Sequence, residues 1–360
     1  MAYRRKHTLF GQEKNRHPFL RFLLFFIVLA LAVALLLNAI SNGSVMLDKV
    51  SLTISRLGGN YRILHISDLH GAQFGTAQSD LALAWKNNGY SIVCITGDMI
   101  SKDGDMTPFR DLVTKLSDNT PILFVPGDED PDPIIAVPHG NDTAYADWLL
   151  EIMEQKSNFV YLDAPYKVVS NGTTIWFCPE SVISLDIDVL ENTLNARGAM
   201  LAEQEDNTLT RAQTAAVDYQ RDRVARIRAA RAEMLPGDVY IVLTHHPIQQ
   251  STYSLSNPPR VRGLSEGEYP ISLILSGHYN GGQVRLPLVG ALRAPITSEL
   301  GSGGWFPKDN QLSGMTTLYG IHQYISPGLG LSQVYPWYMQ FRLYNRPTVA
   351  LITLTPNLLQ

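Results

Sequence analysis

Cysteine is scarce in this sequence, with only two among 360 residues. Cys94 and Cys178 both lie in apolar runs, so we expect two buried free thiols rather than a disulfide framework or a zinc ribbon. Charged residues are also infrequent, at 17%, whereas hydrophobic residues make up 45%, which is an ordinary balance for a globular protein. A chain of this length can bury one large core or two smaller ones.

Positive charge is lacking over most of the chain. The formal net charge is −4, but six of the 29 basic residues and only one of the 33 acidic residues precede Phe22. The 23 basic and 32 acidic residues that remain give the rest of the chain a charge of about −9. Because nucleic-acid binding normally requires a basic face, we expect no nucleic-acid partner.

Long hydrophobic runs are also lacking, with one exception near the N-terminus. Residues 22–37 contain no polar residue, and residues 38–40 extend the run to about the 20 residues that a membrane-spanning helix needs. The sequence therefore predicts a basic cytoplasmic segment (1–21), a transmembrane anchor (22–40) and an extracytoplasmic remainder, because basic flanks stay in the cytoplasm. A cleaved signal peptide is the alternative, although its apolar region is usually shorter, at about 7–15 residues.

Short runs rich in Ile, Val and Leu recur along the rest of the chain. They lie at residues 62–67, 91–96, 121–126, 239–244 and 272–276, and helix-compatible segments at 79–89 and 107–118 separate the first three. This alternation predicts an α/β layered fold whose strands are buried on both faces. We also expect a linker and first strand at 41–60 and closing strands at 341–345 and 348–354.

One segment differs from this pattern. Residues 190–235 are rich in Ala, Arg, Glu and Gln and contain no proline. Val217, Val224, Ile227 and Met234 recur at three- and seven-residue steps, which predicts a narrow apolar stripe on one or two amphipathic helices. We interpret the segment as a helical insertion that packs on the domain, with substrate gating or a membrane-surface role as the alternatives, the latter weakened by its mixed charge.

Each of the five apolar runs ends in acidic or histidine residues. In chain order these are Asp68 and His70; Asp98; Asp128, Glu129 and Asp130; His245 and His246; and His278, which Asn280 follows. A single such residue has little meaning, since an Asp after a strand is often a helix cap and a histidine such as His65 often belongs to the core. Taken together, however, they can converge, because strand ends about 4.8 Å apart meet at one sheet edge.

Mixed carboxylate, imidazole and amide ligands suit borderline divalent metals, here manganese first, with iron or zinc as alternatives. There are more ligands than one ion needs, which predicts two divalent ions about 3.5–4 Å apart at a site for displacement at phosphorus. Glycines precede Asp98, Asp128 and His278 and let the backbone approach such ions closely.

The order D-x-H, GD, GD-x-D, H-x-P, GH-x-N resembles the motif series of the calcineurin-like metallophosphoesterases. In that family the series normally runs D-x-H, GD, GNH, H, GH-x-H. The likeness covers about residues 50–356, and the C-terminal part is similar to a membrane-anchored bacterial branch related to UDP-2,3-diacylglucosamine pyrophosphatases. The resemblance implies a four-layer αββα sandwich over residues 61–356, interrupted by the helical insertion.

The resemblance also implies roles for individual residues. Asp68, His70 and Asp98 would hold one metal, with Asp98 bridging to a second metal held by His245 and His278. Three positions depart from the family pattern: Asn280 replaces an imidazole, Asp128 replaces an asparagine, and Glu129 replaces a histidine that assists the leaving group. Asp128 and Asn280 remain predicted metal ligands, and the candidate catalytic residues are Glu129, Asp128 and His246, with His322 in reserve.

The sequence thus predicts a phosphoesterase that acts on phosphodiester, pyrophosphate or phosphomonoester groups of envelope or lipid-linked molecules. A catalytically impaired homologue that binds a phosphorylated ligand is the alternative. Five aromatic residues cluster in the loop-rich C-terminal part: Trp305, Phe306, Tyr335, Trp337 and Tyr338. We expect most of them to pack in the core, although a lipid groove or the bilayer interface would also suit them.

Overall fold

The computed structural model of the chain describes residues 18–134, 144–249, 254, 256–263, 267–294, 304–307, 312–333 and 335–357. It has two compact units, Met1–Gly43 and Ser44–Gln360. In the first unit, helix α1 (Pro18–Asn42) contains the stretch Phe19–Ile40, which is long and apolar enough to cross a membrane. A signal sequence has the same character. Most of the predicted basic segment lies outside the described residues.

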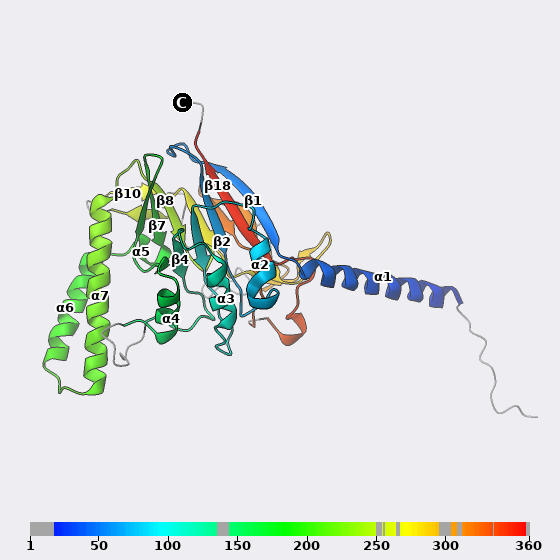
Figure 1. The fold of residues 1–360 in the computed structure, drawn as a ribbon, viewed down its shortest axis with the longest axis horizontal. Helices are drawn as coiled ribbons and strands as arrows, with labels where there is room; N and C mark the ends of the chain where they lie inside the picture. The colour runs from blue at the N-terminus through cyan, green and yellow to red at the C-terminus, as the bar shows by residue number, and fades with distance from the viewer. Residues whose placement is uncertain are drawn as a thin grey trace, which may run out of the picture. The chain divides into compact units, whose positions relative to one another are not determined.

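Two six-stranded sheets form the second unit (Figure 1). The first has the order β1-β18-β2-β3-β4-β5, with strands β1 (Met46–Thr53), β2 (Tyr61–Ile66), β3 (Ile92–Thr96), β4 (Ile122–Val125), β5 (Phe159–Tyr161) and β18 (Thr348–Thr355). The second has the order β16-β17-β11-β8-β7-β6, with strands β6 (Tyr166–Ser170), β7 (Thr173–Pro179), β8 (Val239–Leu243), β11 (Leu273–Ser276), β16 (Gly314–Leu318) and β17 (Ile321–Ile325).

The central strands of both sheets run parallel. In the first sheet β2, β3, β4 and β5 are parallel neighbours, and in the second β7, β8, β11 and β17 are. Every residue of β3 and of β8 is buried, as expected for strands that are covered on both faces. Cys94 on β3 and Cys178 on β7 are buried free thiols, which confirms the expectation from the sequence.

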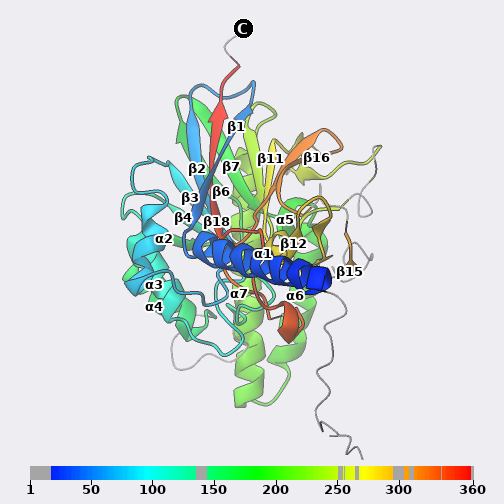
Figure 2. The same cartoon turned by 90° about the vertical axis from the view of Figure 1, so that its right-hand side faces the viewer.

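The two sheets enclose one core and carry helices on their outer faces. Ile63 and Ile92 of the first sheet pack with Phe177 and Ile241 of the second. Helices α2 (Ser79–Leu83), α3 (Thr107–Lys115) and α4 (Asp147–Gln155) cover the outer face of the first sheet, and α5 (Glu180–Ile183) lies on the second (Figure 2). This order of helices, sheet, sheet and helices confirms the predicted αββα sandwich.

Two long helices follow α5. They are α6 (Ile187–Ala202) and α7 (Thr208–Glu233), and Asn207 caps α7 by accepting a hydrogen bond from the backbone of Thr210 at 3.0 Å. The predicted stripe is buried: Val217, Val224 and Ile227 pack against α6, and Met234 packs on the second sheet. The periodicity therefore located the buried face of these helices correctly.

The remaining elements are short. They are η1 (Thr76–Gln78), β9 (Arg260–Arg262), β10 (Glu268–Pro270), η2 (Asn280–Gly282), β12 (Arg285–Leu286), β13 (Gly290–Ala291), β14 (Arg293–Ala294), β15 (Gly304–Trp305) and η4 (Trp337–Met339). The strand predicted at 341–345 is wrong, because only Leu343 there forms a β-bridge, to Val284. The helix predicted at 79–89 is also shorter than expected and ends at Leu83.

Candidate metal centre

The candidate ligands lie in the loops that leave β2, β3, β4, β8 and β11 at their carboxyl ends. Five of them have a positive φ: Asp68 (55°), His70 (47°), Asp98 (54°), His278 (72°) and Asn280 (49°). Such a conformation is unfavourable for residues other than glycine and is maintained only where surrounding interactions enforce it. Its concentration in these loops indicates a functional site.

Hydrogen bonds between the loops enforce this conformation. The backbone N–H of His70 donates to the Asp98 carbonyl at 2.8 Å, and that of Asp68 donates to Gly97 at 2.9 Å. Across the two sheets, the backbone N–H of His278 donates to Asp68 Oδ1 at 2.9 Å. These hydrogen bonds therefore join the loops of both sheets without the help of a metal ion.

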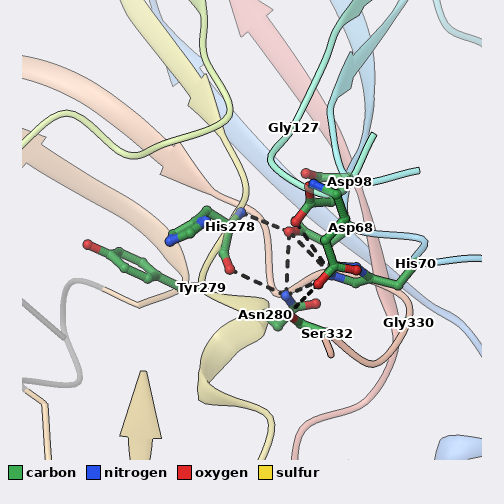
Figure 3. A network of polar contacts seen from close by, with 12 residues as sticks. Asp68, His70, Asp98, Gly127, His278, Tyr279, Asn280, Gly330 and Ser332 are labelled. Carbon is green, nitrogen blue, oxygen red and sulfur yellow. Dashed lines mark hydrogen bonds and ion pairs between the residues drawn. The ribbon is translucent and has the colours of Figure 1, made fainter. Parts of the chain in front are cut away.

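Asp68, His70 and Asp98 form the first group of potential ligands, whose ligand atoms all lie within 4.8 Å of one another (Figure 3). All three side chains are buried. Asn280 completes the group from the other sheet, with Nδ2 3.1 Å from His70 Nε2. The predicted convergence of strand ends is thus observed for these four residues.

Unpartnered polar atoms show that this group fits a cation. Asp68 Oδ2 and Asn280 Oδ1 are buried and have no hydrogen-bond partner among the described residues. Burying such atoms without a partner is costly, and a divalent ion would satisfy acceptors of this kind. The Asn280 amide can exchange its oxygen and nitrogen by a half-turn, so its oxygen could also face the ion.

Asp128, His245, His246 and His278 form the second group. The Nδ1 of His245 donates to the Thr96 carbonyl at 2.8 Å, which leaves its Nε2 free to face His278 Nδ1 at 3.3 Å. Asp128 Oδ2 lies 3.3 Å from the same His278 nitrogen. The backbone bond to His245 is typical of a metal-binding histidine, because it fixes which nitrogen is available.

Asp98 lies between the two groups. Its Oδ2 is 3.8 Å from His70 Nε2 in the first group and 3.2 Å from His245 Nε2 in the second. Burial raises the pKa of Asp98, but the imidazoles of His245 and His70 outweigh burial and lower it to about 2. A carboxylate that stays ionised between two ligand groups suits a bridging position.

The charges of the buried groups depend on one another. Burial raises the pKa of Asp68 to about 6, despite the nearby imidazoles. Burial lowers the pKa of His245, but the carboxylates of Asp98 and Asp68 raise it to about 10. Burial lowers the pKa of His278. The carboxylates thus require positive charge close by, which the imidazoles supply here and divalent ions would supply more strongly.

Glu129 does not face the open edge of the site. Its Oε2 bonds to His70 Nδ1 at 2.7 Å, and its Oε1 accepts hydrogen bonds from Ser332 Oγ at 3.1 Å and from the Gln333 backbone at 3.2 Å. Its own backbone N–H donates to Asp98 Oδ1 at 2.8 Å. The carboxylate thus lies on the opposite side of the imidazole from the other ligands, where it orients His70.

Its neighbours have separate contacts. Asp130 is half-buried and accepts hydrogen bonds from the backbones of Met99, Ile100 and Gly127, so it joins the loops after β3 and β4. Asp128, by contrast, is half exposed, and its carboxylate contacts two histidines of the second group, His246 and His278. The three consecutive acidic residues therefore point in three directions.

His246 lies at the open side of the second group. Its Nε2 is 2.9 Å from Asp128 Oδ1, its ring centroid is 4.2 Å from that of His278, and 41% of its side chain is exposed. Together with His245 it lines a cavity of about 400 Å³, whose lining also includes Tyr219 and Arg223 of α7. The helical insertion therefore reaches the edge of the site.

Among the described residues, the two remaining histidines, His65 and His322, belong to neither ligand group. His322 pairs with Leu273 at the start of β11, the opposite end of that strand from His278. His65 is fully buried, bonds to Thr96 Oγ1 at 2.8 Å, and has its pKa lowered to about 3 by burial. His65 is thus a core histidine, as expected.

The sequence did not indicate the role of Arg342. This buried guanidinium donates to the carbonyls of Gly330 at 2.6 Å and Gly328 at 3.2 Å, and burial lowers its pKa to about 10. Asn345, three residues later, donates to the Asn280 carbonyl at 2.7 Å. The glycine-rich stretch 328–330 was visible in the sequence, but nothing there indicated that the arginine 12 residues after Gly330 holds it.

Gly277 offers a test of the close approach between the sheets. A Cβ there would lie 2.0 Å from Ser67 Oγ and 2.4 Å from Asp68 Oδ2. We expect Gly277→Ala to weaken metal binding at least about tenfold, because it displaces Asp68. Titration with Mn²⁺ measures this, and Gly237→Ala, whose Cβ meets nothing within 4 Å, is the matched control. Unchanged affinity in Gly277→Ala would contradict the assigned geometry.

Glu129 offers a test of how His70 is held. We expect Glu129→Ala to weaken Mn²⁺ binding by about 10–100-fold, the usual effect of losing the partner of a histidine ligand. Glu129→Gln should retain part of the affinity, because its amide oxygen can still accept from His70 Nδ1. Glu154→Ala, at an exposed position on α4, is the control. Equal affinities in all three variants would show that Glu129 does not position His70.

Comparison with known proteins agrees with this geometry. The sequence model described as calcineurin-like phosphoesterase matches residues 61–280, which include every ligand candidate named above. No curated protein matches the chain.

Similar solved structures are distant. Phosphopantetheinyl hydrolase from Mycobacterium tuberculosis has 12% identity and a TM-score of 0.35, with 81% of this chain and 98% of that chain covered. A purple acid phosphatase from yellow lupin (Lupinus luteus) seeds has 10% identity and a TM-score of 0.33, with 76% of this chain and 45% of that chain covered. These values carry no functional argument. The family model does, because it matches more than half of the sequence: the chain belongs to the calcineurin-like phosphoesterase family.

Proposed function

We propose that this phosphoesterase uses a binuclear centre, with Asp98 shared between its two ions. The position of Asp98 Oδ2, 3.8 Å from His70 Nε2 and 3.2 Å from His245 Nε2, carries the proposal. Asp68, His70 and Asn280 would hold the first ion, and His245, His278 and Asp128 the second. When bound, such ions lower the pKa of water and stabilise charge on phosphoryl oxygens. Manganese suits these ligands, as do iron and zinc.

The protein's own groups would handle the leaving group. His246 Nε2 is partly exposed beside the cavity and bonds to Asp128 Oδ1 at 2.9 Å, so it can present a proton to a leaving oxygen while Asp128 orients the ring. Glu129, another candidate for this role, instead bonds to His70. We therefore propose Glu129 as a positioning residue and His246 as the proton donor.

The alternative function is binding of a phosphorylated ligand without efficient turnover. Two observations favour it: Asn280 stands where the family pattern has an imidazole, and the Glu129 carboxylate is turned away from the open edge. Measurement of metal content together with turnover on a panel of phosphodiesters, pyrophosphates and phosphomonoesters separates the two functions. Bound metal without turnover on any of them would favour the binding protein.

We further propose that α1 anchors the enzyme in the cytoplasmic membrane with the catalytic domain outside. The stretch Phe19–Ile40 is 22 residues long, sufficient for a bilayer core of about 30 Å, and the basic residues precede it. Substrates would then be phosphoesters of envelope or lipid-linked molecules.

Replacement of the shared carboxylate tests the binuclear proposal. We expect Asp98→Asn to lower kcat for an aryl phosphodiester with Mn²⁺ by about 100-fold or more, the scale on which loss of one electrostatic contributor acts. Asp206→Asn, an exposed position in the loop between α6 and α7, is the control. Undiminished turnover in Asp98→Asn would refute the role of Asp98.

The topology can be tested with the full-length protein in bacterial spheroplasts. We expect added protease to digest the domain after residue 43 while a cytoplasmic marker stays intact. The mass of the purified protein should include residues 22–40, which a cleaved signal peptide would remove. Protection of the domain until the cells are lysed would reverse the proposed orientation.

A further inference from the structure

Large aromatic side chains are exposed in the C-terminal part of the domain. We call them the aromatic surface: Trp305, Phe306, Trp337, Tyr338, Phe341 and Tyr344, each at least 42% exposed. The expectation that most of the aromatic cluster packs in the core is wrong: of its five members only Tyr335 is buried. A soluble protein rarely exposes so much apolar area in one region without using it.

The segments that carry the aromatic surface are joined to one another. The N–H of Phe306 donates to the Leu292 carbonyl at 2.9 Å, and the Arg293 guanidinium lies 5.8 Å from the centre of the Trp305 ring. Arg285, which begins β12, donates its backbone N–H to the Leu343 carbonyl at 2.9 Å, and β12 pairs with β13 just before Leu292. Residues 285–294, 304–306 and 337–344 therefore form one connected region.

This region adjoins the point where the chain enters the domain. Arg346, two residues after Tyr344, donates through Nη2 to Ser44 Oγ at 2.7 Å, and the N–H of Met46 donates to the Pro347 carbonyl at 2.8 Å. Since α1 ends at Asn42, two residues before Ser44, the chain itself permits a separation of only about 7 Å between those two residues. An anchored α1 would therefore hold this region close to the membrane.

The same region supports the metal centre. Asn345 donates to the carbonyl of Asn280 at 2.7 Å, and Tyr335 donates its hydroxyl to the carbonyl of Tyr279 at 3.1 Å. Arg342 holds the loop at Gly330, whose N–H bonds to the Asp68 carbonyl at 2.7 Å. Whatever the aromatic surface contacts is therefore brought next to the ligands of the first group.

Charge in this region is opposite to that of the domain as a whole. Residues 281–347 contain five basic and two acidic residues, whereas the chain after residue 21 carries about −9. Arg293 lies beside the Trp305 ring, Arg285 bonds to Leu343 between Phe341 and Tyr344, and Arg346 follows Tyr344 by two residues. Tryptophan and tyrosine favour the headgroup level of a bilayer, and arginine is attracted to anionic lipids there.

We propose that the aromatic surface docks on the lipid bilayer in which α1 is anchored. The bilayer, rather than a second copy of the chain, fits the short connection to α1, the tryptophan and tyrosine content and the local basic charge. Docking would present the metal centre to phosphoesters held at the membrane surface. This last consequence, a lipid or lipid-linked substrate, rests on the proposed phosphoesterase function.

Tryptophan fluorescence provides a direct test, because all five tryptophans lie after residue 43. The full-length protein is reconstituted in nanodiscs with brominated acyl chains, which quench only nearby indoles, and is compared with the same protein in unbrominated nanodiscs. We expect quenching in the native protein and its loss in the double variant Trp305→Phe/Trp337→Phe. Trp148→Phe, on α4, is the matched control and should retain the quenching.

The outcomes separate docking from catalysis. Absence of quenching in the native protein, or its persistence in the double variant, would overturn the docking proposal. Dimers that form only through the aromatic surface, without quenching, would assign the surface to contact with a second copy of the chain and would also overturn the docking proposal. Turnover of soluble phosphodiesters, pyrophosphates and phosphomonoesters by the same sample reports on the phosphoesterase function independently, so quenching without turnover of any of them would count against that function and leave docking intact.

Discussion

The Asp98 carboxylate is the point on which the arrangement of the site depends. It faces imidazoles from both ligand groups, and its Oδ1 accepts the backbone N–H of Glu129. These contacts join loops that follow three strands of one sheet and one strand of the other. Because burial makes an isolated carboxylate costly, the surrounding imidazoles, or the ions that they would bind, are required for its charge. The same contacts of Asp98 therefore balance its charge and hold the loops of the two sheets together.

The surrounding structure enforces unfavourable backbone conformations at the same place. Asp68, His70, Asp98, His278 and Asn280 all have a positive φ, and each sits in a loop bonded to another loop. The buried guanidinium of Arg342 and the carboxylate of Asp130 hold these loops by hydrogen bonds to backbone groups rather than to the ligand side chains. Rigid support of this kind keeps ligand atoms in place before ions bind, which favours affinity and catalysis.

The departures from the usual family pattern have a local explanation. The carboxylate of Glu129 bonds to the imidazole of His70, and Asn280 completes the same group with an amide. The lost histidine of the third motif has a neighbour of similar chemistry in His246, which comes from a different strand and lies at the open side. The ligand groups are therefore arranged differently from the usual pattern, His246 is the proposed proton donor, and α7 lines the cavity beside it.

The sequence alone determined the layered α/β fold, the apolar N-terminal helix, the helical insertion and the convergence of Asp68, Asp98, His245 and His278. It could do so because strand ends, apolar runs and helical periodicity are local patterns, and parallel strands bring their ends to one edge. Only the tertiary structure decided where Glu129 points, that Arg342 supports the site, and that residues 341–345 form a loop rather than a strand. Those outcomes depend on contacts between distant segments, since a side chain's direction and exposure are set by neighbours that the chain order does not show.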